Sequence, residues 1–314
     1  MLNIRGFVKG ADEPVWVEVL NAAYEEYESW WRGITVEEMC EREKCPDFDF
    51  EGRFIAELDG KPVGVVHAHV NKLREEKKGF MHTLCVIPEF RGLGVEEKLA
   101  ELVINELKKR GMNVIEAWTG CKRNDRIQFF EKYGFKPVYK TFDMEIDLTN
   151  IPCNIGENKQ VTIQLLRKNV EGDIKTLNWL SNECYRNFPN YRPRTIEETR
   201  NSVLNHPHLK EQEIFFAVLN QKNAGYSGVG IDEKYNIQWN VKSGRISRIG
   251  VLEPYRRKGI GTRLILQSLE MLKAKGMTRA MLDTEDSNPT NAKKLYEKVG
   301  FEVMQEYLTY EKRL

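Results

Sequence analysis

With 314 residues, 41% of them hydrophobic and 30% charged, the chain has a globular composition and enough length for two domains of about 150 residues each. Its 48 basic and 47 acidic residues leave a net charge of +1, which argues against nucleic acid or an anionic membrane as a partner. The start has no apolar signal core, and the six cysteines form no CxxC pair. We therefore expect a cytoplasmic protein with reduced thiols, no disulfide framework and no zinc site.

The first half of the chain reads as two helices, three strands, a helix, a strand, a helix and a final pair of strands. The third strand ends at Val86 and runs into a glycine-bearing turn that opens the next helix. The best-defined elements are a helix at 14–30, strands at 54–58 and 63–70, a helix at 95–107 and a strand at 114–118.

The second half repeats the first about 165 residues later. Residues 86–95 (VIPEFRGLGV) align with 251–260 (VLEPYRRKGI), and residues 131–135 (EKYGF) match 297–301 (EKVGF) one residue later in the count. Order, spacing and residue type agree over about 50 positions, which indicates a duplication. In the second copy we expect helices at 170–186 and 260–272, and strands at 214–219, 226–231 and 280–283.

A strand that ends in a glycine turn before a helix is able to hold phosphate. The first N–H groups of the helix are unpaired and the helix dipole favours an anion there, while glycine lets the chain approach closely. The run Arg256-Arg257-Lys258-Gly259-Ile260-Gly261 adds three cations to this arrangement. Such a turn also occurs where glycine is needed only for steric reasons, so the surrounding sequence decides whether it binds phosphate.

That context resembles the GNAT superfamily of N-acetyltransferases. Arg256-x-x-Gly259-x-Gly261 is similar to the family's (Gln/Arg)-x-x-Gly-x-(Gly/Ala) pyrophosphate loop. About 30 residues later, NPTNA at 288–292 and YEKVGF at 296–301 are similar to its Asn…Ala…Leu-Tyr…Gly-Phe helix. The tandem arrangement is similar to that of members such as mycothiol synthase, although no residue indicates that substrate.

The resemblance implies a mixed α/β (α+β) sheet flanked by helices in each half, as two tandem GNAT-like acyl-CoA N-acyltransferase domains. The predicted parts are a diverged, non-catalytic domain at 1–148, a linker at 149–159 that carries Pro, Gly and Asn, and a catalytic domain at 160–314. The implied activity is direct transfer of an acetyl group to the primary amine of a small molecule. We expect a monomer or a homodimer.

The resemblance also places acetyl-CoA in a V-shaped opening between the fourth and fifth strands of the second copy, with no metal. Main-chain amides from Arg257 to Thr262 would hold the pyrophosphate. Main-chain groups of 249–251 would bond the pantetheine arm, one N–H near Val251 polarising the thioester carbonyl. The expected cofactor-binding residues are Ile249, Gly250, Val251, Arg256, Arg257, Lys258, Gly259, Ile260, Gly261, Thr262, Asn288 and Asn291.

For the chemistry, the resemblance assigns protonation of the leaving thiolate to Tyr296, whose phenol has a pKa near that of a thiol. The alternative is that Tyr296 packs on the sheet. The fourth strand, 245–249, has no carboxylate, so the family's strand-borne glutamate is absent. Asp283 and Glu285 are the nearest candidate bases; the alternatives are that both cap a loop, and that a chain of waters takes the proton.

The first copy departs from the pattern at two decisive positions. Glu96 stands where Gly261 does, and Phe130 stands where Tyr296 does. A carboxylate would occupy the place of the phosphates, and phenylalanine cannot donate a proton. We therefore predict that the first copy does not catalyse and binds CoA weakly if at all.

Its strands also carry His67, His69 and His82, with His82 expected opposite His67. Three imidazoles within reach of one another could bind a metal, but no Asp or Cys completes a ligand set in the sequence pattern. The preferred interpretation is therefore that they line a pocket and are hydrogen-bonded. Trp30 and Trp31 are expected to pack at a helix end.

On the acceptor side, the connection at 185–194 is aromatic, basic and stiffened by proline. It could clamp a small acceptor that bears a carboxylate or phosphate, or form a packed surface loop. Two rival functions remain: a CoA-binding sensor or scaffold with decayed catalysis, and a nucleotide-phosphate binder of another fold. The absence of a Gly-Lys-Ser/Thr ending and of an acid for the ribose argues against the last.

Overall fold

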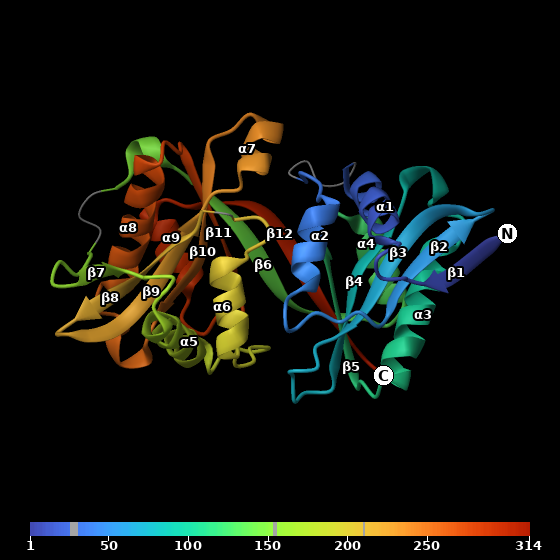
Figure 1. Ribbon diagram of the computed structural model, residues 1–314, viewed down its shortest axis with the longest axis horizontal. Helices are drawn as coiled ribbons and strands as arrows, with labels where there is room; N and C mark the ends of the chain where they lie inside the picture. Colours follow the sequence, from blue (N-terminus) through green and yellow to red (C-terminus); the bar gives the residue numbers. More distant parts are fainter. Residues whose placement is uncertain (26–30, 153–155, 210) are drawn as a thin grey trace. The chain divides into compact units, whose positions relative to one another are not determined.

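The computed structural model describes residues 1–25, 31–152, 156–209 and 211–314, which form two compact units (Figure 1). Unit 1 comprises residues 1–138 and 308–314, and unit 2 comprises residues 139–307. None of the described helices is both long and apolar enough to cross a membrane. None of the five described cysteines forms a disulfide bond, and the sixth, Cys153, lies outside the described residues.

Unit 1 contains a mixed sheet. Strands β1 to β4 pair in chain order as antiparallel neighbours, β5 is parallel to β4, and the end of β12 (Glu302–Arg313) lies beside β5. The elements are β1 (Leu2–Gly6), α1 (Glu13–Glu25), α2 (Val36–Glu43), β2 (Arg53–Leu58), β3 (Lys61–Val70), β4 (Lys78–Val86), a 3-10 turn at Pro88–Phe90, α3 (Val95–Lys109), β5 (Val114–Gly120) and α4 (Asn124–Lys132).

Helices cover both faces of this sheet because successive strand side chains point to opposite sides. Ile55 and Val65 are fully buried in one core with residues of α1 and α2. Their neighbours Ala56 and Val66 are fully buried in a second core with residues of α3 and α4. The near-continuous apolar runs of β2 and β3 follow from this burial on both faces.

Unit 2 has the same plan, with the strand order β12-β6-β11-β10-β9-β8-β7. Its elements are β6 (Lys136–Asp147, in this unit from Tyr139), a 3-10 turn at Leu148–Asn150, β7 (Thr162–Leu165), α5 (Glu171–Tyr185), α6 (Ile196–Leu204), β8 (Glu213–Leu219), β9 (Lys222–Gly230), α7 (Glu233–Trp239), β10 (Ser243–Val251), a 3-10 turn at Glu253–Tyr255, α8 (Ile260–Ala274), β11 (Arg279–Glu285), α9 (Ala292–Val299) and the start of β12.

Most predicted elements are found, and both strand ends at Val86 and Val251 are confirmed. The first helix is described over Glu13–Glu25, and the rest of its predicted span, 26–30, lies outside the described residues. Strands β1 and β7 and helix α7 were missed, because the strands are short and α7 is largely polar.

The end of each copy differs from the prediction. We expected a pair of closing strands, but β6 and β12 are single strands of 12 residues each, since neither segment contains a turn dipeptide. Strand β6 comes from the first copy yet pairs antiparallel with β11, from Arg279↔Asp147 to Glu285↔Thr141. The boundary between the two compact units therefore falls inside β6, whereas the linker was predicted at 149–159, and residues 308–314 return to unit 1.

Candidate functional site

In unit 2 the parallel strands β10 and β11 pair at one end only. Three residue pairs join them, from Ser243↔Arg279 to Arg245↔Met281, and the strands separate beyond this point. The register between β10 and β9 shifts at Ser247, and such a bulge bends a strand and increases its twist. The opening that results is the V-shaped gap that the resemblance predicts between the fourth and fifth strands.

A pocket of about 220 Å³ lies in this opening. Residues from five elements contribute to it: the two separated strands β10 and β11, the end of α5, β6 and α9. The lining residues are Tyr139, Thr141, Tyr185, Phe188, 246–249, 282–285, Asn288 and Tyr296. All three predicted catalytic residues, Tyr296, Asp283 and Glu285, therefore line one pocket.

The main chain of β10 presents one edge to the pocket. The N–H of Leu252 donates to the carbonyl of Ala224 on β9 (2.9 Å), so by alternation the main-chain groups of Ile249 and Val251 face away from β9. The hydroxyl of Tyr185 donates to the Ile249 carbonyl (2.7 Å). The N–H groups of Ile249 and Val251 face the same way as the carbonyls of these two residues, toward the opening. Gly250 lies between them, where a Cβ would stand 2.7 Å from the ring of Tyr226.

The glycine turn leads into α8, whose N-terminus is uncapped. Gly259 takes a left-handed conformation (φ 73°), and none of the described side chains caps the helix or places an acid in its first turn. The N–H groups of Ile260, Gly261 and Thr262 are therefore at the positive end of the helix dipole. Gly261 also has a packing role, because a Cβ at this position would lie 3.1 Å from Leu295.

The predicted linker packs against this turn. The main-chain N–H of Asn158 donates to the carbonyl of Gly259 (3.2 Å), and its side-chain amide donates to the carbonyl of Lys258 (3.0 Å). Glu157 forms an ion pair with Arg263 on α8 (3.5 Å). A Cβ on Gly259 would stand 2.6 Å from the carbonyl of Gly156. The linker thus binds the carbonyl groups of the turn, and the N–H groups of the turn stay available to other partners.

The three cations of the turn do not behave alike. Arg256 donates to the carbonyls of Val251 (3.0 Å) and Cys184 (2.9 Å), which ties the end of β10 to α5. This side chain therefore ties two elements of the fold together, a use that the sequence did not indicate. Arg257 and Lys258 are the exposed cations, and Arg257 has the left-handed φ of 60° that Gly92 has in the first copy (72°).

Tyr296 lies on α9 with only 5% of its surface exposed, and its side chain reaches the pocket. Burial, and to a lesser extent the negative charge of Asp283, raises the pKa of Tyr296 above its ordinary value. The phenol is therefore protonated at neutral pH, as a proton donor must be. Its helix begins after a turn in which Asn288 accepts from the N–H (2.9 Å) and hydroxyl (2.7 Å) of Thr290, and Asn291 is the N-cap (φ 56°).

Beside Asp283 lies another acidic residue, Asp143, that the sequence did not indicate. Arg245 holds Asp283 (2.6 Å) and also lies 3.6 Å from Asp143 on β6. Burial raises the pKa of Asp143, and the positive charge of Arg245 only partly opposes this shift. Glu285 accepts from the hydroxyl of Ser287 (2.8 Å).

Several residues that line the pocket were not indicated by the sequence. Tyr139 and Thr141 belong to the strand contributed by the first copy, so only the strand exchange reveals them. The hydroxyl of Thr284 is buried and has no partner among the described residues. Arg248, at the bulge, donates to Gln212 (2.9 Å), and burial lowers its pKa to about 10.

The loop at 185–194 lies partly against the pocket and partly against the fold. Tyr185 and Phe188 face the pocket, with ring centroids 4.6 Å apart. The rest of the loop is tied to the fold: Tyr191 donates to Asn182 (2.6 Å), and Arg192 pairs with Glu198. The aromatic part of the loop thus lines the pocket, whereas the Arg192 guanidinium is used by the protein.

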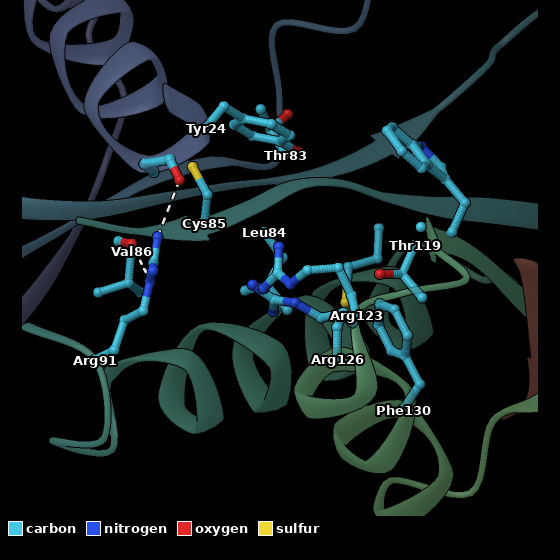
Figure 2. A pocket seen from close by; sticks show the side chains of 14 residues that line it. Tyr24, Thr83, Leu84, Cys85, Val86, Arg91, Thr119, Arg123, Arg126 and Phe130 are labelled. Atoms are coloured by element: carbon cyan, nitrogen blue, oxygen red, sulfur yellow. Dashed lines mark hydrogen bonds between the residues drawn. The ribbon is translucent and has the colours of Figure 1, made fainter. Parts of the chain in front are cut away.

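Unit 1 has the same opening, but different side chains fill it (Figure 2). Strands β4 and β5 pair only from Lys78↔Val114 to Phe80↔Glu116. At the start of α3, Glu96 lies 3.9 Å from Arg126 of α4, and the remaining cavity is about 40 Å³. Phe130, in the place of Tyr296, is buried against Phe135 and Tyr310.

The histidine cluster of unit 1 contains an acid that the sequence pattern did not reveal. His67 pairs with His82 as predicted, but Asp49 stands 4.0 Å from His67 Nε2, and Asp49, His67 and His69 bring ligand atoms within 4.8 Å of one another. The expectation that no acid joins the set is therefore wrong. Arg110 donates two bonds to Asp49 (2.9 and 3.0 Å) and neutralises it. Burial lowers the pKa of His69 to about 4 and that of His82 to about 3, so these rings are neutral.

Of the two tryptophans predicted at a helix end, Trp30 lies outside the described residues. Trp31 packs its ring against Tyr24, with centroids 4.9 Å apart.

Comparison with known proteins agrees with this geometry. The Acetyltransferase (GNAT) family matches residues 16–135 and 174–301. An uncharacterized N-acetyltransferase of Methanocaldococcus jannaschii is 34% identical over 91 residues, 28% of this chain and 40% of that protein. A mycothiol acetyltransferase of Thermomonospora curvata is 28% identical over 136 residues, 43% of this chain and 44% of that protein. This chain thus aligns with less than half the length of these relatives.

Among solved structures, a tandem GNAT protein from the clavulanic acid biosynthesis pathway has a TM-score of 0.74 at 14% identity, over 100% of this chain and 98% of that one. A GCN5-related N-acetyltransferase from Sphaerobacter thermophilus has a TM-score of 0.71 at 19% identity, over 99% and 95%. At these identities the likeness concerns the fold.

Proposed function

Because the chain belongs to the acetyltransferase (GNAT) family, we propose that it is an acetyl-CoA-dependent N-acetyltransferase that acts on the primary amine of a small molecule in unit 2. One observation carries this proposal. The separated strands β10 and β11 and the buried phenol of Tyr296 line one pocket, and the uncapped start of α8 lies beside the end of β10 and α9, where a Cβ on Gly261 would stand 3.9 Å from Val251 and 3.1 Å from Leu295. The two copies share the fold, but only the second combines these three features.

The residues of the turn fit the donor. The N–H groups between Arg257 and Thr262 would hold its diphosphate, since an uncapped helix start favours an anion. Arg257 and Lys258 would add positive charge at the same place, and the edge of β10 at 249–251 would bond the pantetheine arm. Acetyl-CoA would supply the acetyl group as a thioester.

The protein's part in the transfer is proton movement and charge stabilisation. The N–H of Val251 would donate to the carbonyl oxygen as negative charge develops on it. Tyr296 would hold its proton until the thiolate leaves, and then donate it. Removal of the proton from the amine falls to Asp283, to Glu285 or to water along the pocket, and the variants D283N and E285Q separate these three.

The test is an assay of the full chain with acetyl-CoA and a panel of small primary amines. Thiol release and the N-acetylated product are followed together, the product by mass spectrometry. We expect thiol release that depends on one class of amine, with equal amounts of product. Tight acetyl-CoA binding without amine-dependent release across the panel would instead favour a sensor with decayed catalysis.

A further inference from the structure

The cavity in unit 1 has a chemistry of its own. It lies between the separated ends of β4 and β5, at the position that the candidate site has in unit 2 (Figure 2). Its volume of about 40 Å³ is room for roughly three waters, at 10–15 Å³ each, and far too little for a pantetheine arm. Three guanidinium groups reach it, from Arg91, Arg123 and Arg126.

Two of these groups are engaged by the protein. Arg91 donates to the carbonyls of Val86 (3.1 Å) and Ala23 (2.9 Å), as Arg256 does in unit 2. Arg123 donates two bonds to the carboxylate of Asp125 (3.0 and 2.7 Å). Both therefore have acceptors within the fold.

Arg126 has none. Its side chain is only 11% exposed, and no group in the described part of the chain accepts a hydrogen bond from it. The nearest carboxylate oxygen, on Glu96, is 3.9 Å away, which is too long for a hydrogen bond. A guanidinium carries five N–H donors, and burying them without acceptors costs free energy. Figure 2 shows Arg126 reaching from α4 into the cavity, where an acceptor would sit.

The other walls indicate what kind of acceptor fits. Leu84 on β4 and Phe130 on α4 are apolar and buried, and they face the same cavity. A planar carboxylate matches the fork of an arginine, and a short apolar tail matches these walls. Glu96, 15% exposed, is the carboxylate that forms an ion pair with Arg126 and would compete with such an anion, whereas Asp125 is held by Arg123.

We propose that this cavity of unit 1 binds a small monocarboxylate, with its carboxylate on Arg126 and its short tail against Leu84 and Phe130. The first copy thus becomes a binding module for an anion different from the donor of unit 2. The inference does not depend on acetyl transfer by unit 2.

The test is calorimetric titration of the full chain with acetate and propionate at constant chloride. We expect one site per chain. The variant R126Q should weaken binding at least about tenfold, because hydrogen bonds to a charged group are lost. The variant E96Q should tighten it about threefold to tenfold, because a competing carboxylate is removed. R279Q, which removes an exposed arginine of unit 2, is the control and should bind like wild type.

Three results would overturn the proposal: R126Q that binds like wild type, E96Q that binds more weakly, or phosphate that binds better than propionate with the same dependence on Arg126. Because R126Q removes a buried charge, R126K serves as the second variant. It keeps the charge but not the fork, so it should retain weakened binding if the fold is intact. Acetyl-CoA titrated into R126Q reports separately on unit 2.

Discussion

Glu96 lies 3.9 Å from Arg126 in unit 1, and this pair stands where unit 2 has Gly261 and Ala292. Arg126 precedes Phe130 by four residues, as Ala292 precedes Tyr296. In the first copy two charged side chains thus fill the space between the helix starts, while in the second the helices meet through glycine and Leu295. The same fold therefore leaves an open turn in one copy and a charged plug in the other.

The variant Y296F should lower kcat roughly 10²- to 10⁴-fold while leaving the affinity for acetyl-CoA nearly unchanged. Phenylalanine keeps the ring contact with Phe301 but cannot donate a proton. Steady-state kinetics and calorimetry measure the two effects separately. Y310F is the matched control: Tyr310 is buried in unit 1 and its hydroxyl has no partner among the described residues, so turnover should not change. Full turnover by Y296F would remove the assigned acid.

The variant R257G should raise stability and weaken donor binding at once. A non-glycine residue in the left-handed region costs about 1 kcal/mol, which glycine recovers. Loss of the cation should weaken the binding of acetyl-CoA about twofold to fivefold and reduce the salt dependence of that binding. Thermal unfolding and calorimetry at two salt concentrations measure these effects.

The reverse change, G92R in unit 1, should destabilise by a similar amount without affecting donor binding, since a Cβ there meets no neighbour within 4 Å. If R257G lowered the unfolding temperature, the strain argument would be wrong.

Deletion of residues 308–314 should destabilise unit 1 and spare unit 2. This segment buries Tyr310 in unit 1, and Lys312 donates to the carbonyl of Tyr133 (2.7 Å). Hydrogen exchange should therefore become faster in β5, while β11 keeps its protection and acetyl-CoA still binds. Unchanged exchange in β5 would mean that the last strand does not support unit 1.

Acidification should destabilise unit 1 through its buried histidines. Burial lowers the pKa of His69 to about 4 and of His82 to about 3, while the unfolded chain takes up protons near pH 6.5. Above about pH 6.5 these histidines do not lower the free energy of unfolding. As the pH drops toward 4, that free energy falls by up to about 1.4 kcal/mol per pH unit for each histidine. Thermal unfolding across this range measures the slope, and H69Q should flatten it. A wild-type curve that is flat from pH 7 to 4 would refute this account.

The sequence predicted what depends on local pattern and repetition. The ends of β4 and β10 and the helix at 171–185 follow from alternation and amphipathic spacing, and the duplication showed which turn is open. Pairings between distant segments were out of reach. Nothing in Tyr139 or Asp143 indicates that their strand pairs with β11, because β6 alternates like any other strand.

Side-chain direction was the second limit. Arg256 has the same sequence signal whether it points at a phosphate or at the carbonyls of Val251 and Cys184, and only the position of α5 decides. Asp49 likewise precedes β2 in a loop, and its place beside His67 depends on how that loop folds over the sheet.

The central claim is that the turn at Gly259 and Gly261 holds the diphosphate of the donor. Calorimetric titration of acetyl-CoA into the full chain and the variants G261E and E96G tests it most directly, with the unfolding temperature as a check of the fold. We predict one site per chain in wild type and in E96G, and an affinity at least about 100-fold weaker in G261E, because a carboxylate then faces the phosphates. A folded G261E that binds acetyl-CoA as tightly as wild type would contradict the account.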